Sequence, residues 1–294
     1  MRLYDDIIVS GNRAIARSYA KINLTLDVLG KRENGYHDVK MIMQTLSLFD
    51  LVIVDKEKAG IVVSTNIKHL PVGDKNIAWK AAKLFFDEIG ISGGCKILIH
   101  KNIPIAAGLA GGSGNAAAVL CALDKLYNTN LSLEKLLKMG EKLGADVPFC
   151  ILGGTVLAEG IGEIMTELPA VPKTDILLVK PPVSVSTGKI YEEIDGLTDP
   201  HHPDTDLVID AIKNGDMDKV SKNLSNIMED VTVLDAPEIL KIKEDLVKMG
   251  AKGALMSGSG PTVYGIFDDF KTAKSAHDVF SKEYKETFLT KTYN

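Results

Sequence analysis

The chain has 294 residues, of which 45% are hydrophobic and 25% are charged, and its formal net charge at pH 7 is −5. These values are typical of globular proteins and leave room for one large or two ordinary domains. The acidic balance argues against nonspecific binding to nucleic acid, which requires basic surfaces.

The N-terminus is too acidic for a signal peptide, and no apolar run approaches the length that spans a membrane. The three cysteines, Cys95, Cys121 and Cys150, lie in apolar runs without the spacing of metal ligands. We therefore expect reduced thiols in a cytoplasmic protein that binds neither nucleic acid nor membranes.

The first part of the chain predicts a mixture of strands and helices. Alternating apolar residues in the segment Ile15–Leu29 predict a strand. Further strands are expected at Val39–Leu48, Leu51–Asp55, Gly60–Ser64, Lys96–His100 and Ile151–Ala158, and helices at Asn76–Ile89, 115–127 and 132–143.

Two prolines in the segment Leu168–Pro172 predict a domain boundary, which divides the chain into residues 1–167 and 168–294. The later part predicts strands at Asp175–Val179, Gly253–Met256, Thr262–Phe267 and 286–290, and helices at 187–195, 205–214, 216–228, 236–249 and 270–282. Strands mixed with clustered helices indicate an α+β fold.

Residues 104–116 read Pro-Ile-Ala-Ala-Gly-Leu-Ala-Gly-Gly-Ser-Gly-Asn-Ala and precede a run of helix formers. Glycine lets backbone N–H groups approach an anion closely, and a helix N-terminus adds the positive end of its dipole. The segment therefore predicts a phosphate-binding loop, in which the hydroxyl of Ser113 could contact a phosphate oxygen or a magnesium ion. The alternative is a flexible loop that happens to precede a helix.

Several classes of phosphate-binding protein are disfavoured because the sequence lacks their motifs. The Walker pattern is absent and the loop holds no lysine, which argues against a P-loop NTPase. Residues 112–117 match the dinucleotide fingerprint, but the acidic residue at the expected distance, Glu134, falls in a predicted helix rather than at a strand end. The His-Arg-Asp and Asp-Phe-Gly motifs of protein kinases are also absent.

Three other segments carry polar groups in suggestive patterns. Asp146 either caps a short helix opened by Pro148 or presents a carboxylate that accepts the proton of an alcohol. The segment Met256–Thr262 forms either a tight hairpin or a second anion-facing loop. The predicted first strand has one polar face, which either lies in solvent or holds a cation near phosphate, and which consists of Lys21, Asn23, Thr25 and Asp27.

Nearly the whole chain resembles the small-molecule kinases named after galactose, homoserine, mevalonate and phosphomevalonate, the GHMP kinases. Their three motifs match Ala20–Leu24, Pro104–Ala116 and Ser257–Thr262 in order. The segments Arg32–His37, Gly144–Phe149 and Pro182–Tyr191 resemble family members whose acceptor carries cytidine diphosphate. The resemblance implies an N-terminal domain like the second domain of ribosomal protein S5 and a ferredoxin-like C-terminal domain. It also implies an ATP-dependent kinase that uses Mg²⁺ and a small-molecule alcohol.

The resemblance further implies a role for individual residues. Asp146 would be the catalytic carboxylate and Lys21 its cationic neighbour. The acceptor would be bound by Asn23, Tyr36, His37, Thr187 and Tyr191, with Tyr36 and His37 on the cytidine and Tyr191 stacked on its base. ATP would be bound by Asn76, Lys101, Pro104, Ala106, Gly108, Leu109, Ala110, Gly111, Gly112, Ser113 and Gly114.

Magnesium coordination is expected only from Ser113, because Gly114 stands where relatives of this kind often have a second serine. Two alternatives stay open: a homoserine or mevalonate type of kinase without the base-binding residues, and a nonenzymatic nucleotide-binding regulator that would have lost Lys21 or Asp146. A monomer or weak homodimer is expected. His201 and His202 are expected in a loop rather than in a metal site.

Overall fold

The structure, a computed structural model, describes residues 3–198 and 200–294. The chain forms two compact units. Unit 1 comprises the chain up to Ala20 together with Leu48–Ile105 and Ala110–Gly153, and unit 2 comprises Lys21–Ser47, Ala106–Leu109 and Gly154–Asn294. The predicted boundary between residues 167 and 168 lies inside unit 2, and the division into domains 1–167 and 168–294 stays a prediction.

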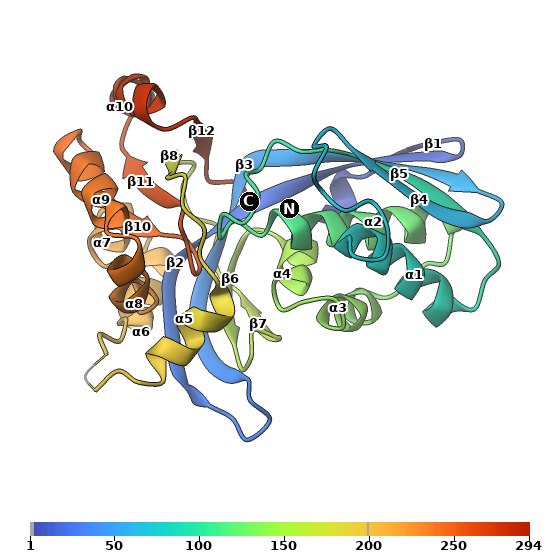
Figure 1. The fold of residues 1–294 in the computed structure, drawn as a ribbon, viewed down its shortest axis with the longest axis horizontal. Helices are drawn as coiled ribbons and strands as arrows, with labels where there is room; N and C mark the ends of the chain where they lie inside the picture. The colour runs from blue at the N-terminus through green and yellow to red at the C-terminus, as the bar shows by residue number, and fades with distance from the viewer. Residues whose placement is uncertain (1–2, 199) are drawn as a thin grey trace. The chain divides into compact units, whose positions relative to one another are not determined.

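Unit 1 consists of helices packed on one face of a sheet (Figure 1). The strands follow the order β1-β2-β3-β5-β4, with the bounds Ile8–Ser10, Arg13–Lys31, His37–Glu57, Gly94–His100 and Gly60–Thr65; β2 and β3 continue into unit 2. The helices are α1 (Ile77–Ile89), α2 (Gly111–Tyr127), α3 (Leu133–Glu141) and α4 (Asp146–Leu152), preceded by the 3₁₀ helix η1 (Leu3–Asp6).

The core of unit 1 forms because α2 is unusually rich in small residues. Ala116, Ala117 and Ala118 are all fully buried, and short side chains let α2 lie close against α1 and α4. The same hydrophobic cluster includes Phe85 from α1 and Ile97 from β5. The glycine-rich segment therefore leads into a helix of which 12 of 17 residues are buried.

Unit 2 contains the remainder of β2 and β3 and a separate antiparallel sheet. β6 (Thr155–Glu159) pairs with β3 and with β7 (Ile164–Glu167), and β9 (Ser225–Asn226) runs parallel to β2. The separate sheet has the order β10-β11-β8-β12, with the bounds Gly253–Met256, Val263–Phe267, Asp175–Lys180 and Glu286–Lys291.

The helices of unit 2 are α5 (Thr187–Ile194), α6 (Thr205–Lys213), α7 (Met217–Lys222), α8 (Glu229–Asp235), α9 (Glu238–Lys248) and α10 (Phe270–Glu283). Of these, α9 packs on β10 and β11, and α10 packs on β8 and β12 (Figure 1). The antiparallel sheet with its helices confirms the expected α+β class.

Several predicted elements have different bounds in the structure. The expected strands Val39–Leu48 and Leu51–Asp55 form one strand, β3. The expected strand Ile151–Ala158 is wrong at its beginning, because α4 continues to Leu152 and Gly153 and Gly154 turn the chain with φ of 68° and 76°. The expected helix 216–228 ends at Lys222.

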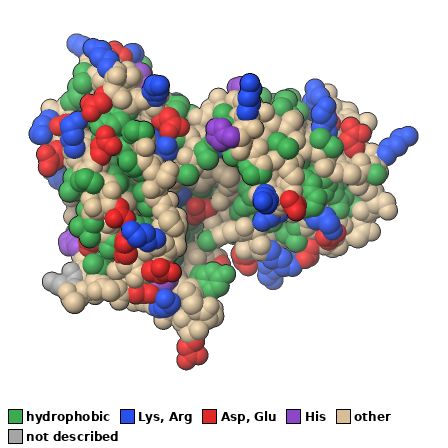
Figure 2. All heavy atoms as spheres, in the orientation of Figure 1, with side chains coloured by type: hydrophobic (Ala, Val, Ile, Leu, Met, Phe, Trp, Pro, Cys, Tyr) green, Lys and Arg blue, Asp and Glu red, His purple; other side chains and the backbone are tan. Residues whose placement is uncertain are grey.

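The surface carries charged side chains of both signs, as the composition predicts. Acidic and basic side chains are interspersed over the visible face of both units (Figure 2). Among residues 3–198 and 200–294, no helix has both the length and the apolar character needed to cross a membrane.

The side chain of Asn226 explains why the expected helix 216–228 is interrupted. Asn226 is 4% exposed, and its Nδ2 donates to the carbonyls of Met256 at 2.9 Å and Gly258 at 2.8 Å. Its Oδ1 accepts from the N–H of Met228 at 3.0 Å. One amide therefore ties β9 to the turn that follows β10.

Replacing this amide should destabilise the protein. Asn226→Ala leaves two buried carbonyls and one N–H without a partner, and each unsatisfied buried group costs about 1–3 kcal/mol. We expect the free energy of unfolding in urea to fall by at least about 2 kcal/mol. The matched control is Asn223→Ala, since Asn223 donates to the Lys219 carbonyl at an exposed site. An equal loss in both variants would contradict the role given to Asn226.

Candidate active site

The backbone of the segment 104–116 contains three residues in left-handed conformations. Ala106, Gly108 and Ala110 adopt left-handed conformations, with φ of 50°, 71° and 54°. Left-handed residues at alternating positions are typical of backbone nests, in which N–H groups converge on an anion. Two of the three are alanines, for which this conformation is strained, and such strain is concentrated in functional loops.

Helix α2 begins at Gly111, four residues before the predicted start at 115. Its N-cap residue is Ala110, and no side chain of the described residues caps this end. The N–H groups of the first turn are therefore left for another acceptor, and the helix dipole favours an anion there. The phosphate-binding role of this segment stays a prediction.

Two glycines of the segment are required by close contacts. A Cβ on Gly108 would lie 2.0 Å from the carbonyl oxygen of Ser257, and the Ser257 hydroxyl donates to the Gly108 carbonyl at 3.0 Å. A Cβ on Gly114 would lie 2.5 Å from Oγ of Ser18. At Gly112, by contrast, the nearest atom is Cγ2 of Ile77 at 3.6 Å, so that position has room for a side chain.

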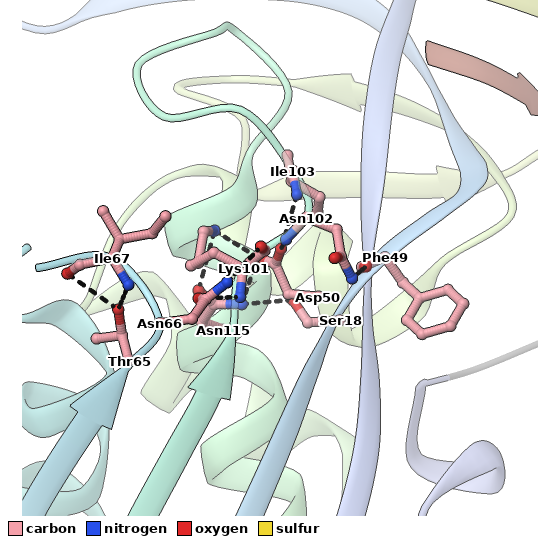
Figure 3. A network of polar contacts seen from close by, with 10 residues as sticks. All are labelled: Ser18, Phe49, Asp50, Thr65, Asn66, Ile67, Lys101, Asn102, Ile103 and Asn115. Atoms are coloured by element: carbon pink, nitrogen blue, oxygen red, sulfur yellow. Dashed lines mark hydrogen bonds and ion pairs between the residues drawn. The ribbon is translucent and has the colours of Figure 1, made fainter. Parts of the chain in front are cut away.

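A buried carboxylate holds the start of this segment in unit 1 (Figure 3). Oδ1 of Asp50, on β3, accepts from the N–H groups of Asn102 at 2.7 Å and Ile103 at 2.8 Å. Its Oδ2 accepts from Nδ2 of Asn115 at 2.9 Å and forms an ion pair with Nζ of Lys101. Asp50 is fully buried, so these donors replace water around its charge.

Asn115 extends the same network into α2. Its Oδ1 accepts from Nζ of Lys101 at 3.2 Å, and its Nδ2 also donates to Oγ of Ser18 at 3.0 Å. A Cβ on Gly111 would lie 3.0 Å from Nζ of Lys101, which places this amine against the first turn of α2. The network thus joins β3, the chain that enters the glycine-rich segment, and the helix that follows it.

The predicted nucleotide-binding residues Asn76 and Lys101 have structural partners here. The side chain of Asn76 caps α1 by accepting from the N–H of Ala78 at 2.9 Å, and it donates to the Pro71 carbonyl at 2.7 Å. The Lys101 side chain is 7% exposed. Both residues stabilise the surroundings of the loop, and their contact with a nucleotide stays a prediction.

In unit 2, the polar face of β2 is buried. Lys21, Asn23, Thr25 and Asp27 are at most 5% exposed, so the alternative of a solvated face is wrong. Nζ of Lys21 donates to Oδ1 of Asn23 at 2.7 Å, and the same oxygen accepts from the N–H of Gly258 at 3.0 Å. This places a lysine amine beside the glycine turn 257–260, which in turn contacts Gly108.

The residues predicted to bind a base also gather in unit 2. The rings of His37 and Tyr191 are stacked, with centroids 4.7 Å apart and planes 22° apart. Tyr36 is 61% exposed in the hairpin between β2 and β3. Thr187 begins α5, and its hydroxyl lies 2.8 Å from that of Ser259.

Asp146 is the first residue of α4 and is half-buried. The N-cap position is occupied by Ala145, so the prediction that Asp146 caps this helix is wrong. His201 and His202 lie in a loop as expected, where Nδ1 of His202 is 2.7 Å from Oδ1 of Asp27.

Neither a reactive thiol at Cys95 or Cys121 nor a metal-binding cluster is present among the described residues. Burial raises the pKa of Cys95 and of Cys121 to about 12, so neither thiol is a nucleophile at neutral pH. Within residues 3–198 and 200–294, no three His, Cys, Asp or Glu side chains are grouped so that they could hold a metal ion.

Family models match the chain in two places. The model of the N-terminal domain of GHMP kinases matches residues 76–154, and that of the C-terminal domain matches residues 208–286. The first match contains the glycine-rich segment and Asp146, and the second contains the turn 257–260. The chain belongs to the GHMP kinase family.

Individual relatives indicate which members of the GHMP kinase family this chain is most similar to among those compared. The chain is 51% identical to 4-diphosphocytidyl-2-C-methyl-D-erythritol kinase of Lachnoclostridium phytofermentans over 94% of this chain and 96% of the relative. It is 46% identical to the enzyme of the same name from Clostridium kluyveri, over 95% and 99%. A crystal structure of 4-(cytidine 5'-diphospho)-2C-methyl-D-erythritol kinase has a TM-score of 0.82 and 30% identity, over 95% of this chain and 100% of that one. Homoserine kinase from Cytophaga hutchinsonii, at 17% identity, 97% and 96% coverage and a TM-score of 0.73, shares the fold.

The site contains residues that the sequence did not single out, namely Asp50, Asn115 and Ser18. Apart from the contact between Asn115 and Lys101, their contacts span 51 to 97 positions of the chain, which no local motif reveals. The available signal is Asp50 itself, an acidic residue in the otherwise apolar run 48–54, between two predicted strands.

Removing the charge of Asp50 should unfold or loosen unit 1. Asp50→Asn leaves the buried Lys101 amine without its carboxylate, and breaking a buried pair in this way costs about 3–5 kcal/mol. Urea unfolding measures the loss. The matched control is Asp55→Asn on the same strand, because Asp55 pairs with Arg13 at an exposed site and should matter much less. Equal stability of both variants would contradict the role of Asp50.

Replacement by alanine should lower ATP affinity at Gly108 but not at Gly112. Gly108→Ala places a Cβ against the Ser257 carbonyl at a left-handed position, so the loop must shift. A lost hydrogen bond to a charged phosphate is worth about 1.5–3 kcal/mol, so ATP affinity measured by calorimetry should fall at least about tenfold. Gly112→Ala has room for its Cβ and is the control. Unchanged affinity in folded Gly108→Ala would contradict this view of the loop.

Proposed function

We propose that this protein transfers the γ-phosphoryl group of ATP to the 2-hydroxyl of 4-diphosphocytidyl-2-C-methyl-D-erythritol, giving the 2-phosphate and ADP. The observation that carries the proposal is the 51% identity, over 94% of the chain, to a curated kinase of that name. The reaction belongs to the non-mevalonate route to isoprenoid precursors, a cytoplasmic pathway, and we expect the enzyme to act as a monomer or weak homodimer.

The glycine-rich segment is the proposed ATP site. The left-handed turns at 106–110 and the uncapped start of α2 present N–H groups that suit the β- and γ-phosphates. The proposed contacts are made by Pro104, Ala106, Gly108, Leu109, Ala110, Gly111, Gly112, Ser113 and Gly114, with Asn76 and Lys101 nearby. Magnesium, held by phosphate oxygens and the Ser113 hydroxyl, would neutralise charge on the phosphates.

The chemical step needs a positioned alcohol, a proton acceptor and charge stabilisation. Asp146 is the proposed base, which takes the proton of the 2-hydroxyl as its oxygen attacks the γ-phosphorus and ADP leaves. Lys21 supplies a positive charge that stabilises the transferring group, and the amide of Asn23 fixes the direction of its amine at 2.7 Å.

The acceptor's cytidine is the part that separates this function from those of other family members. Tyr36, His37, Thr187 and Tyr191 are the proposed contacts, and they occur together in unit 2. The base would gain stacking from Tyr191 and hydrogen bonds at its edge from His37. The acceptor is therefore proposed to be a cytidine diphosphate-linked methylerythritol.

A coupled assay for ADP release tests the proposal. We expect turnover with the cytidylated acceptor and none above background with mevalonate, homoserine or free methylerythritol. Turnover with mevalonate or homoserine would favour another GHMP kinase. ATP binding without turnover of any of them would favour the nonenzymatic regulator.

The carboxylate of Asp146 should be required for turnover but not for binding. Asp146→Asn removes the base, and a positioned general base contributes about 10²–10⁴-fold, so kcat should fall by that factor. Calorimetry should show ATP affinity close to that of the wild type. Glu141→Gln, an exposed carboxylate at the end of α3, is the control. A kcat within about threefold of wild type in the Asp146→Asn variant would remove Asp146 from the mechanism.

A further inference from the structure

The imidazole of His37 is held by a carboxylate that has no role in the proposal above. Its Nε2 lies 2.8 Å from Oδ1 of Asp195, the C-cap residue of α5. The His37 side chain is 7% exposed, and its ring is stacked on Tyr191, four positions before Asp195. Asp195 and Tyr191 therefore fix both the direction and the plane of the ring.

Asp195 is kept ionised by a second partner. Nζ of Lys31 donates to its Oδ2 at 2.8 Å. Hydrogen bonds from Lys31 and then from His37 lower the pKa of the Asp195 carboxyl below its usual value. An ionised carboxylate only accepts hydrogen bonds, so the Nε2 that faces it must be the nitrogen that carries the proton.

The proton on Nε2 decides what the other ring nitrogen can do. In a neutral imidazole only one nitrogen is protonated, so Nδ1 of His37 is left as an acceptor. Within the part of the chain that the structure describes, no hydrogen bond to this Nδ1 is formed. An acceptor in this position matches a donor on a ligand.

We propose that Asp195 is the positioning residue that makes the site selective for cytosine, by holding His37 in the tautomer that accepts at Nδ1. This rests on the proposed function, in which His37 contacts the edge of the base. Cytosine carries an exocyclic amine, a donor, where uracil carries a carbonyl oxygen, an acceptor. An accepting Nδ1 therefore bonds to cytosine and meets an unfavourable acceptor in uracil.

The ring geometry allows edge contact and stacking together. The His37 and Tyr191 planes are within 22° of parallel. A base bonded in the plane of the imidazole would then also lie nearly parallel to the phenol ring, as offset stacking requires. An aromatic ring can stack on any base, so discrimination between cytosine and uracil depends on hydrogen bonds at the edge of the base.

Asparagine at position 195 would reverse the tautomer. Its amide can donate from Nδ2 to Nε2 of His37, which moves the proton to Nδ1 and turns the base-facing nitrogen into a donor. Asp195→Glu keeps an accepting carboxylate. Lys31→Met is the matched control, since it removes the other partner of Asp195 and leaves the contact with His37 in place.

The first measurement is the tautomer of His37 by ¹⁵N NMR of the imidazole at pH 8, with His37→Gln used to assign its signals. We expect the proton on Nε2 in the wild type and in Lys31→Met, and on Nδ1 in Asp195→Asn. A wild-type proton on Nδ1 would overturn the inference whatever the substrate of the enzyme is.

The second measurement is kcat/KM for the acceptor and for its uridine analogue. The cytidine-to-uridine ratio should fall about tenfold or more in Asp195→Asn, through KM rather than kcat, and should be largely kept in Asp195→Glu and Lys31→Met. A reversed tautomer with an unchanged ratio would overturn the inference while leaving the kinase function standing. A wild-type enzyme that acts only on acceptors without a nucleotide would overturn the proposed function and, with it, the selectivity role. The NMR result on the tautomer would then stand by itself.

Discussion

The carboxylate of Asp50 is the interaction on which the geometry of the glycine-rich segment depends. This buried carboxylate accepts hydrogen bonds from two backbone N–H groups and one amide, and it pairs with one ammonium group. A buried charge of this kind is tolerable only when all its donors are in place, so the four groups must assemble together. The chain that enters the glycine-rich segment and the helix that follows it are therefore held in place by the protein's own groups.

In unit 2, buried amide side chains rather than a charged carboxylate hold the turns in place. Asn23 accepts from Lys21 and from Gly258, while Asn226 donates to two carbonyls of the neighbouring turn. The amine of Lys21 donates to the neutral amide oxygen of Asn23, whereas the amine of Lys101 is paired with the charged carboxylate of Asp50.

The local features of this fold could be predicted from the sequence, and the long-range ones could not. The periodicity of Asn76–Ile89 and the glycines of 104–116 act over a few residues, and the structure has α1 and the turn-rich loop there. Asp50, Asn226 and Asp195 act mainly through partners 30 to 164 positions away, where no short pattern links them. For the same reason the sequence does not reveal that the polar face of β2 is buried, because alternation alone does not show what covers each face.

Ser18 and Gly114 share a single volume at the base of α2. The Ser18 hydroxyl lies 2.5 Å from where a side chain at position 114 would begin, and it is held there by Asn115. Either position can carry a side chain, but both cannot. Relatives with a second serine in the loop should therefore have a smaller or differently directed residue on the first long strand. A side chain at position 114 would then depend on a change at position 18, whereas a smaller residue at position 18 causes no clash by itself.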